Sequence, residues 1–133
     1  MYVLHYVPDW ASICVHLALA EMGVPYRLNL IDADGGGLTQ PDHLRRQPFG
    51  LIPALDSPAG PIFETGAILL WLSERHGLAP APGSPERAAF LSWFVFTNQQ
   101  SIKHTLFKYS SPLPNRNSKA DGLHRLAVYP FAS

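Results

Sequence analysis

Two short runs of residues carry the chemistry of this chain. The first is Gln47–Leu55, in which Pro53 stands where the apolar pattern predicts a β-strand. Proline has no N–H to donate to a strand ladder, so this position is an edge, a bulge or a cis turn. A cis Ile52–Pro53 bond would leave the backbone N–H and C=O of Ile52 unpaired. An extended peptide could then pair with Ile52 by strand addition.

The second run is Glu64 and Thr65, which close a strand and open the next helix. The free N–H groups and the dipole at a helix N-terminus attract a carboxylate. The alternative for these residues is an acidic helix start with a capping threonine. A peptide slot next to a carboxylate pocket predicts a binding site for a small acidic peptide.

Both runs resemble the glutathione-binding half of the glutathione S-transferase family. The signature of that family is an Asn/Gln-Pro pair, a Val/Ile-Pro-x-Leu run, and Glu/Gln-Ser/Thr-x-Ala-Ile at a helix start. The matching residues here are Gln47, Pro48, Ile52, Pro53, Ala54, Leu55, Glu64, Thr65, Ala67 and Ile68. The resemblance covers residues 2–77 and continues more weakly through the helix that follows residue 84.

The resemblance implies how glutathione, as co-substrate, would be held. Ile52, next to Pro53, would pair its backbone with the cysteinyl unit. Thr65 and Glu64 would take the carboxylate and the ammonium of the γ-glutamyl unit.

The glycine end of glutathione has no obvious anchor in this sequence. Relatives use a Lys, His or Gln near the positions of Leu38 and Leu51, and both residues are apolar here. Arg45 or Arg46 could substitute, and the alternative for both is a solvated helix arginine.

Glutathione transfer needs a thiolate near neutral pH, and a hydroxyl donor at a helix N-terminus lowers a thiol pKa. The loop Tyr6–Ser12 lies at such a place. It resembles the Tyr-Ser-Pro-x-x-Cys-Ser loop of bacterial beta-class transferases, with Ala11 at the cysteine position, so mixed-disulfide chemistry is not expected there. Ser12 is the predicted catalytic hydroxyl, with a plain helix cap as the alternative. Tyr6 is the second candidate, with core packing as its alternative.

Composition excludes several other classes of function. The formal net charge is zero without a basic stripe, so nucleic acid is not expected as a partner. No apolar run approaches the roughly 20 residues of a membrane span, and the first residues do not read as a secretory signal. Cys14 is the only cysteine, so a reducing cytoplasm is expected. The six histidines show no metal-ligand spacing, so no metal is expected.

The order of elements predicts an α/β, thioredoxin-like domain of βαβ-α-ββα type over residues 1–78. Its strands are expected near 2–6, 27–31, 54–56 and 62–63, and its helices at 12–22, 41–46 and 65–76. Residues 79–84 read as a linker rich in proline. Residues 85–133 are expected to form a partial helical domain, with a long helix at about 85–108, an irregular tail and one short helix near 120–128. The second domain is therefore predicted to be truncated.

These features predict a glutathione S-transferase-like enzyme that transfers the glutathione thiolate to a small hydrophobic electrophile and forms a homodimer. The alternative is a non-catalytic glutathione-binding or protein-interaction module of the same fold, or a truncated transferase. Ser12→Ala separates an active from an inactive thiol site, and the electrophile itself is not encoded in any readable motif.

Overall fold

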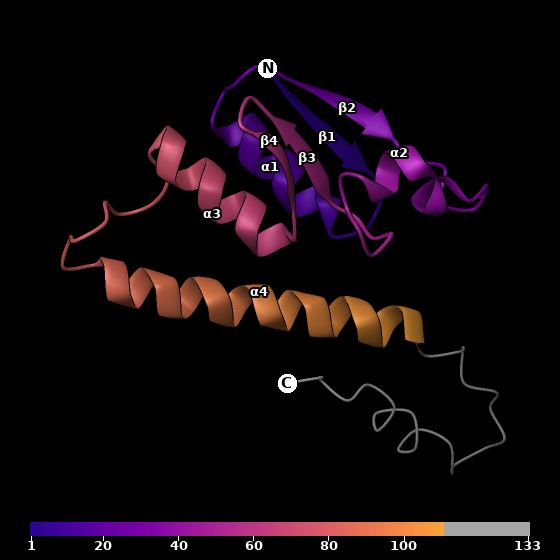
Figure 1. Cartoon of the computed structure of the whole chain (residues 1–133). Helices are drawn as coiled ribbons and strands as arrows, with labels where there is room; N and C mark the ends of the chain where they lie inside the picture. The colour runs from indigo at the N-terminus through magenta and orange to yellow at the C-terminus, as the bar shows by residue number, and fades with distance from the viewer. Residues whose placement is uncertain (111–133) are drawn as a thin grey trace, which may run out of the picture.

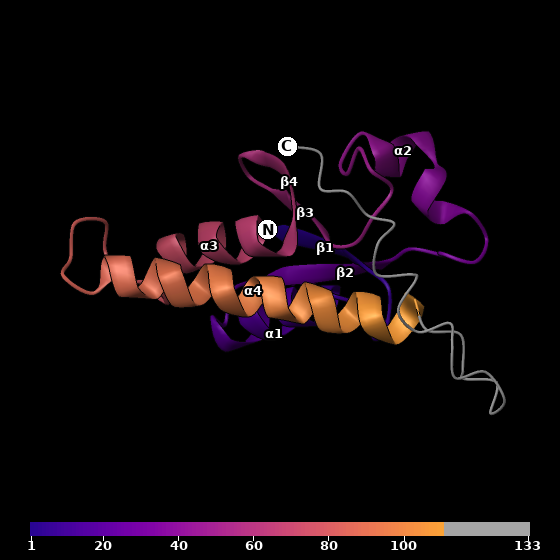
Figure 2. The same ribbon diagram turned by 90° about the horizontal axis from the view of Figure 1, so that it is seen from below.

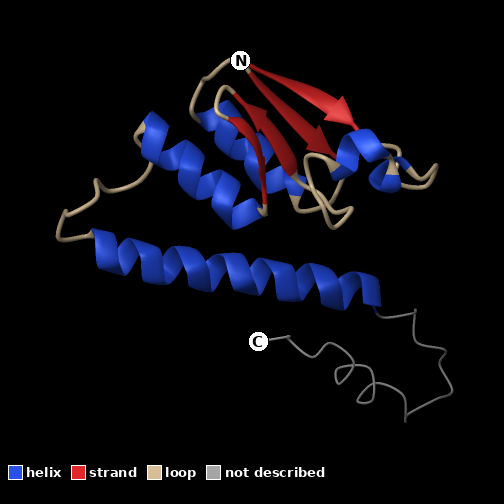
Figure 3. Ribbon diagram, viewed as in Figure 1, coloured by secondary structure: helices blue, strands red, loops and turns tan. Residues whose placement is uncertain are grey.

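The computed structural model describes residues 1–110, with side chains as far as residue 99. A four-stranded mixed sheet lies at its centre, and four helices surround it (Figures 1 and 3). The strands are β1 (Tyr2–Tyr6), β2 (Tyr26–Leu30), β3 (Ala54–Ser57) and β4 (Gly60–Phe63). The helices are α1 (Ser12–Glu21), α2 (Pro41–Leu44), α3 (Thr65–His76) and α4 (Arg87–Ser110), with a short 3₁₀ helix at Gly37–Thr39.

The strands lie in the order β2-β1-β3-β4, and this order fixes which residues share an end of the sheet. β1 is parallel to β2 and antiparallel to β3, and β3 is antiparallel to β4. A parallel β1–α1–β2 unit followed by an antiparallel hairpin and a closing helix is the predicted thioredoxin-like layout. The fold class is thereby confirmed.

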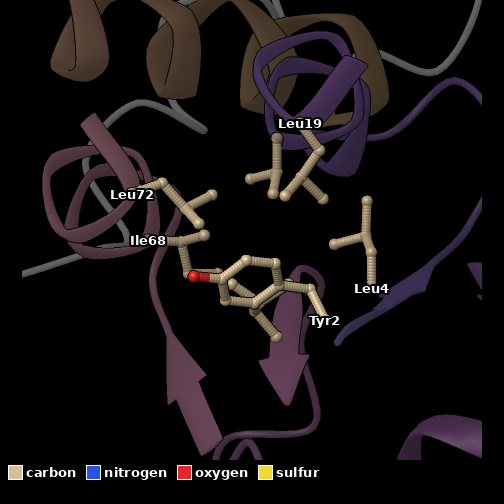
Figure 4. Close-up of a cluster of buried hydrophobic side chains, with 7 residues drawn as sticks. Tyr2, Leu4, Leu19, Ile68 and Leu72 are labelled. Atoms are coloured by element: carbon tan, nitrogen blue, oxygen red, sulfur yellow. The ribbon is translucent and has the colours of Figure 1, made fainter. Parts of the chain in front are cut away.

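The two faces of the sheet are covered by different helices. Side chains alternate along a strand, so Leu4 of β1 points to one face and His5 to the other. α1 and α3 cover the first face, and α2 lies on the opposite side (Figure 2). The core between the sheet, α1 and α3 consists of buried side chains from all three (Figure 4): Tyr2, Leu4, Val15, Leu19, Leu55, Ile68 and Leu72.

α4 packs against α3 and runs antiparallel to it. Near the start of α4, Arg87 forms an ion pair with Glu74 in the second half of α3, and it also donates to the Pro80 carbonyl at 3.0 Å. Eleven residues further along, the Asn98 side chain lies over Gly66 in the first turn of α3. These two contacts place the middle of α4 beside the N-terminus of α3.

The predicted bounds of helices and strands agree best with the structure where a helix-terminating residue follows the element. α3 begins at Thr65 and ends at His76 as predicted, because Gly77 follows it with a φ of 81°. α2 ends at Leu44, two residues before the predicted end. A short 3₁₀ turn at Gly37–Thr39 precedes α2.

The expected irregular tail and the short helix near 120–128 lie outside the described residues. The division of the chain at residues 78 and 84 stays a prediction. No helix within residues 1–110 is both long enough and apolar enough to cross a membrane.

Candidate functional site

The strand register brings three separate segments to one end of the sheet. His5 of β1 is opposite Ala54 of β3, and Ala54 is opposite Phe63 of β4. One position further toward this end of the sheet are Tyr6 after His5, Pro53 before Ala54 and Glu64 after Phe63. These three residues therefore lie side by side. α1 and α3 both begin at this same end, because they follow β1 and β4. The sheet therefore gathers the two sequence runs and the loop Tyr6–Ser12 into one site.

The first part of the site is the peptide-pairing segment at Ile52 and Pro53. The Ile52–Pro53 bond is cis. Among the backbone of residues 1–110 and the side chains described as far as residue 99, no hydrogen bond involves the N–H or C=O of Ile52. The carbonyl of the preceding Leu51 is held, because it accepts a 2.9 Å hydrogen bond from Nε2 of His43. The free donor and acceptor thus lie on a backbone that α2 fixes in place.

The second part is the N-terminus of α3, which has no side-chain cap. Glu64 is the N-cap residue, and neither its side chain nor that of Thr65 caps the first turn. The alternative of a capping threonine is therefore wrong for this structure. The first N–H groups of a helix have no partner inside the helix, so those of α3 remain available to an anion.

Glu64 has a backbone conformation that side chains rarely adopt. Its φ is 70° and its ψ is 123°. Asp9 is the other non-glycine residue with a positive φ within residues 1–110, and it lies in the loop before α1. Such strain costs about 1–3 kcal/mol and gathers at ligand sites, where the surrounding structure holds it.

Ser12 is the first residue of α1 and does not cap it. The N-cap residue is Ala11, and no side chain caps this helix, so the alternative of Ser12 as a plain helix cap is wrong. The Ser12 hydroxyl is buried and donates to the carbonyl of Val7 at 2.9 Å. Tyr6 packs against the core, as its alternative predicted. Catalytic roles for Ser12 and Tyr6 stay predictions.

Asn98 of α4 lies next to the site and was not predicted from the sequence. A Cβ added to Gly66 would lie 2.7 Å from Nδ2 of Asn98, so this amide lies directly on the first turn of α3. A side chain at position 66 would therefore require the Asn98 amide to shift. The available signal was the polar run Asn98–Gln100 inside an otherwise apolar helix, and Asn98 is half-buried in the structure.

A chain of polar contacts fastens α2 to the face of the sheet opposite the core. Buried His5 donates from Nε2 to Asp56 at 3.0 Å, and its Nδ1 accepts from Asn29 at 2.9 Å. Nε of Arg46 lies 3.1 Å from both carboxylate oxygens of Asp56. Arg46 also donates to the carbonyl and the carboxylate of Asp42 in α2. Asp56 thus connects a buried histidine to the helix that holds the peptide-pairing segment.

Protonation of Asp42 is expected to loosen this attachment in acid. The hydrogen bond from Arg46 and the charges of Arg46 and Arg45 hold the pKa of Asp42 below its usual range. The resulting stability is present above the ordinary aspartate pKa, near 4, and is lost as the pH falls through the lowered value. Urea unfolding of Asp42→Asn should show a lower stability at neutral pH. The difference from the natural chain should begin to shrink near pH 4 and disappear as the pH falls through the lowered pKa of Asp42.

Asp34→Asn is the matched control, because Asp34 is an exposed carboxylate on the loop before α2. It should follow the natural chain at every pH. A constant difference between Asp42→Asn and the natural chain in acid would contradict the assignment to Asp42.

Within the described residues, no group of three or more His, Cys, Asp or Glu side chains is placed to hold a metal ion. The site offers backbone donors and acceptors, hydroxyls, and the carboxylates of Glu64 and Asp9. This set can bind a zwitterionic amino-acid group at α3 and an extended peptide at Ile52.

Comparisons with known proteins agree with this geometry. Residues 1–74 match the family model "Glutathione S-transferase, N-terminal domain". Over 100 residues, the chain is 39% identical to the disulfide-bond oxidoreductase YfcG of Escherichia coli K12. That match covers 70% of this chain and 46% of YfcG, so the chain spans about half the length of this relative.

Solved structures give the same result. A glutathione transferase family member from Pseudomonas fluorescens, with two glutathione bound, is 29% identical with a TM-score of 0.64. The match covers 71% of this chain and 44% of that one. A glutathione transferase from Methylococcus capsulatus is also 29% identical, with a TM-score of 0.69, over 84% of this chain and 57% of its own.

Proposed function

The chain belongs to the glutathione S-transferase family, and we propose that it binds reduced glutathione at the end of the sheet where α1 and α3 begin. The observation that carries the proposal is the pairing of two features. The backbone of Ile52 is free of hydrogen bonds among the described residues, and the N-terminus of α3 has no cap beside it. A γ-glutamyl tripeptide needs both features at once.

Each part of glutathione has a complementary group in this proposal. The cysteinyl N–H and C=O pair with the backbone of Ile52. The γ-glutamyl carboxylate binds the N–H groups and hydroxyl at Thr65, and the ammonium binds the Glu64 carboxylate. Pro53 sets the direction of the backbone at this point. The Asn98 amide closes the γ-glutamyl pocket from the side of α4.

The proposed reaction is attack of the glutathione thiolate on a small hydrophobic electrophile. The sulfur forms a bond to the electrophilic carbon, and the electron pair of the broken bond leaves with the displaced group or stays on the adduct. The N-terminus of α1 favours the thiolate over the thiol through its dipole. Phe94 of α4, one helical turn before Asn98, is the proposed apolar wall of the electrophile pocket, and the ring of Phe90 stacks on it at 5.6 Å from the side of Arg87.

Calorimetric titration with reduced glutathione tests the proposal directly. Saturable binding in the micromolar to millimolar range is expected, and Thr65→Val should weaken it, because this change removes the hydroxyl and keeps the shape. Ser57→Val, in the hairpin turn at the other end of β3, is the control for loss of a hydroxyl outside the site. It removes the hydrogen bonds of Ser57 with Gly60 and Ala59, so it should lower stability and leave glutathione binding unchanged. Absence of heat up to about 10 mM glutathione, a free energy weaker than roughly 3 kcal/mol, would overturn the proposal.

Ser12→Ala measures how the thiol is activated. The free energy of unfolding should fall by about 1 kcal/mol, because the Val7 carbonyl loses its donor. A catalytic Ser12 must rotate away from Val7, because one O–H donates one hydrogen bond. If Ser12 is catalytic, Ser12→Ala should also lower turnover about tenfold while glutathione binding is retained. One pKa unit of thiol activation corresponds to a factor of ten. Unchanged turnover would leave Ser12 with a structural role only.

The second candidate function is a non-catalytic glutathione-binding module of the same fold. The observation in its favour is the hydrogen bond that the Ser12 hydroxyl donates to the Val7 carbonyl. This bond engages the hydroxyl that was predicted to be catalytic. The two functions separate when glutathione binds but its thiol titrates as it does in free solution. Ultraviolet absorbance of the bound thiolate against pH measures this.

A homodimer in the cytoplasm belongs to the same proposal. Trp93, Val95 and Phe96 of α4 are each half exposed or more, and Trp93 reaches 67%. Exposed apolar side chains grouped on one helix favour association. Sedimentation of the natural chain and of Trp93→Glu tests the dimer, which the charged variant should dissociate.

A further inference from the structure

A buried histidine of α2 is hydrogen-bonded to the peptide group that carries the N–H of Ile52. His43 is 3% exposed, and its Nε2 lies 2.9 Å from the carbonyl oxygen of Leu51. A carbonyl oxygen only accepts hydrogen bonds, so Nε2 carries a proton and donates it. The carbonyl of Leu51 and the N–H of Ile52 belong to one peptide group. In the proposed site, His43 therefore binds one side of a peptide group whose other side meets the ligand.

The geometry of this peptide group carries the effect of His43 from one side to the other. The Leu51–Ile52 peptide is trans, because the cis bond within residues 1–110 is the next one, between Ile52 and Pro53. In a planar trans peptide the C=O and the N–H point in opposite directions. By holding the Leu51 C=O, His43 thus directs the Ile52 N–H away from its own ring. The same hydrogen bond polarises the peptide group and makes its N–H a stronger donor.

The ring of His43 is itself held in place, so it can impose a direction on this peptide group. The backbone carbonyl of His43 accepts from the Gln47 N–H at 2.9 Å, where α2 ends. The rings of His43 and His5 pack edge to face, with their centroids 6.5 Å apart. His5 is buried and hydrogen-bonded to both Asp56 and Asn29. The position of the His43 ring is therefore fixed by its own helix and by the sheet.

We propose that His43 is a positioning residue for glutathione, and that it acts through the Leu51–Ile52 peptide on a single contact of the ligand. That contact is the hydrogen bond from the Ile52 N–H to the carbonyl of the cysteinyl unit. The inference rests on the proposed function, because it concerns the pairing of that unit with Ile52. The second contact, from the cysteinyl N–H to the Ile52 carbonyl, involves the next peptide group, so loss of the His43 donor should leave it intact.

Calorimetric titration of His43→Phe with two ligands tests the proposal. Phenylalanine keeps an aromatic ring at the buried position and removes the N–H donor. Reduced glutathione has the cysteinyl carbonyl, whereas γ-glutamyl-cysteamine keeps the γ-glutamyl unit, the amide N–H and the thiol but lacks that carbonyl. The variant should bind glutathione about three to ten times more weakly than the natural chain, the size of one neutral hydrogen bond. Its affinity for γ-glutamyl-cysteamine should equal that of the natural chain.

Two further variants separate positioning from a general loss of structure. His43→Gln should recover most of the glutathione affinity, because the glutamine amide can place an N–H near the position of Nε2. His76→Phe is the matched control, because Nε2 of His76 is hydrogen-bonded to the Tyr2 hydroxyl at 2.9 Å at the other end of α3. It should leave both affinities unchanged. Urea unfolding of each variant checks that the titrated chains are folded.

The outcomes distinguish the role of His43 from the proposed function. Unchanged glutathione affinity in His43→Phe, or equal losses for the two ligands, would overturn the positioning role and leave the proposed function intact. A loss in His43→Gln as large as that in His43→Phe would overturn it as well. Binding of neither ligand by the natural chain would overturn the proposed function, and the positioning role with it.

Discussion

Replacement of Glu64 by glycine is expected to make the protein more stable and to weaken its binding of glutathione about tenfold. Glu64 has a φ of 70° and a ψ of 123°, a conformation that is open to glycine and costly for any residue with a Cβ. Relief of this strain should raise the free energy of unfolding by about 1 kcal/mol, after the larger chain entropy of glycine is counted. Loss of the carboxylate removes the proposed partner of the γ-glutamyl ammonium.

Two variants separate the strain at Glu64 from its charge. Glu64→Gln keeps the strained backbone and removes the charge, so stability should change by less than about 0.5 kcal/mol. Its affinity should still fall about tenfold, the size of a lost charge-assisted hydrogen bond. Asp9→Gly relieves the other positive φ, 60°, at a residue outside the proposed ligand contacts. It should stabilise without loss of binding.

Urea unfolding and calorimetry on the same samples decide the outcome. A lower stability of Glu64→Gly would mean that the Glu64 side chain supports the fold. Full glutathione binding by both Glu64 variants would exclude Glu64 from the site.

Replacement of Asp56 by alanine is expected to lower the free energy of unfolding by about 2–3 kcal/mol. The carboxylate accepts hydrogen bonds from buried His5 and from Arg46. Its removal leaves the His5 N–H buried without a partner, and an unsatisfied buried group costs about 1–3 kcal/mol. The Arg46 guanidinium loses one of its two carboxylates. Because Arg46 and His43 hold the Gln47–Leu51 loop in place, glutathione affinity should fall as well.

Asp34→Ala is the control for this change, because Asp34 is exposed in the loop between β2 and α2. Its effect should stay within about 0.5 kcal/mol, as for most surface substitutions. An equal effect of Asp56→Ala and Asp34→Ala would show that the contacts among His5, Asp56 and Arg46 contribute nothing to stability.

Much of the fold could be read from residues that act locally. Gly77 ends α3, the turn at Ser57–Gly60 joins β3 to β4, and the spacing of Ile68 and Leu72 gives α3 its buried stripe. Each of these depends on backbone preferences or on hydrophobic burial within a few residues. The candidate ligand residues were predicted from local signals as well, because a proline and a helix start each mark backbone groups that their neighbours in the chain do not pair.

The sequence by itself determined the fold class and the two halves of the candidate site. The tertiary structure decided what those residues can reach. The sequence suggested Ser12 as an available hydroxyl. In the structure, this hydroxyl donates a hydrogen bond to the carbonyl of Val7. Arg46 was a possible ligand anchor, and the sheet placed Asp56 beside it. Asn98 came to lie on Gly66 because α4 packs along α3. Hydrogen-bond partners distant in the chain meet only after the strands and helices pack, so local patterns cannot show which polar groups remain free.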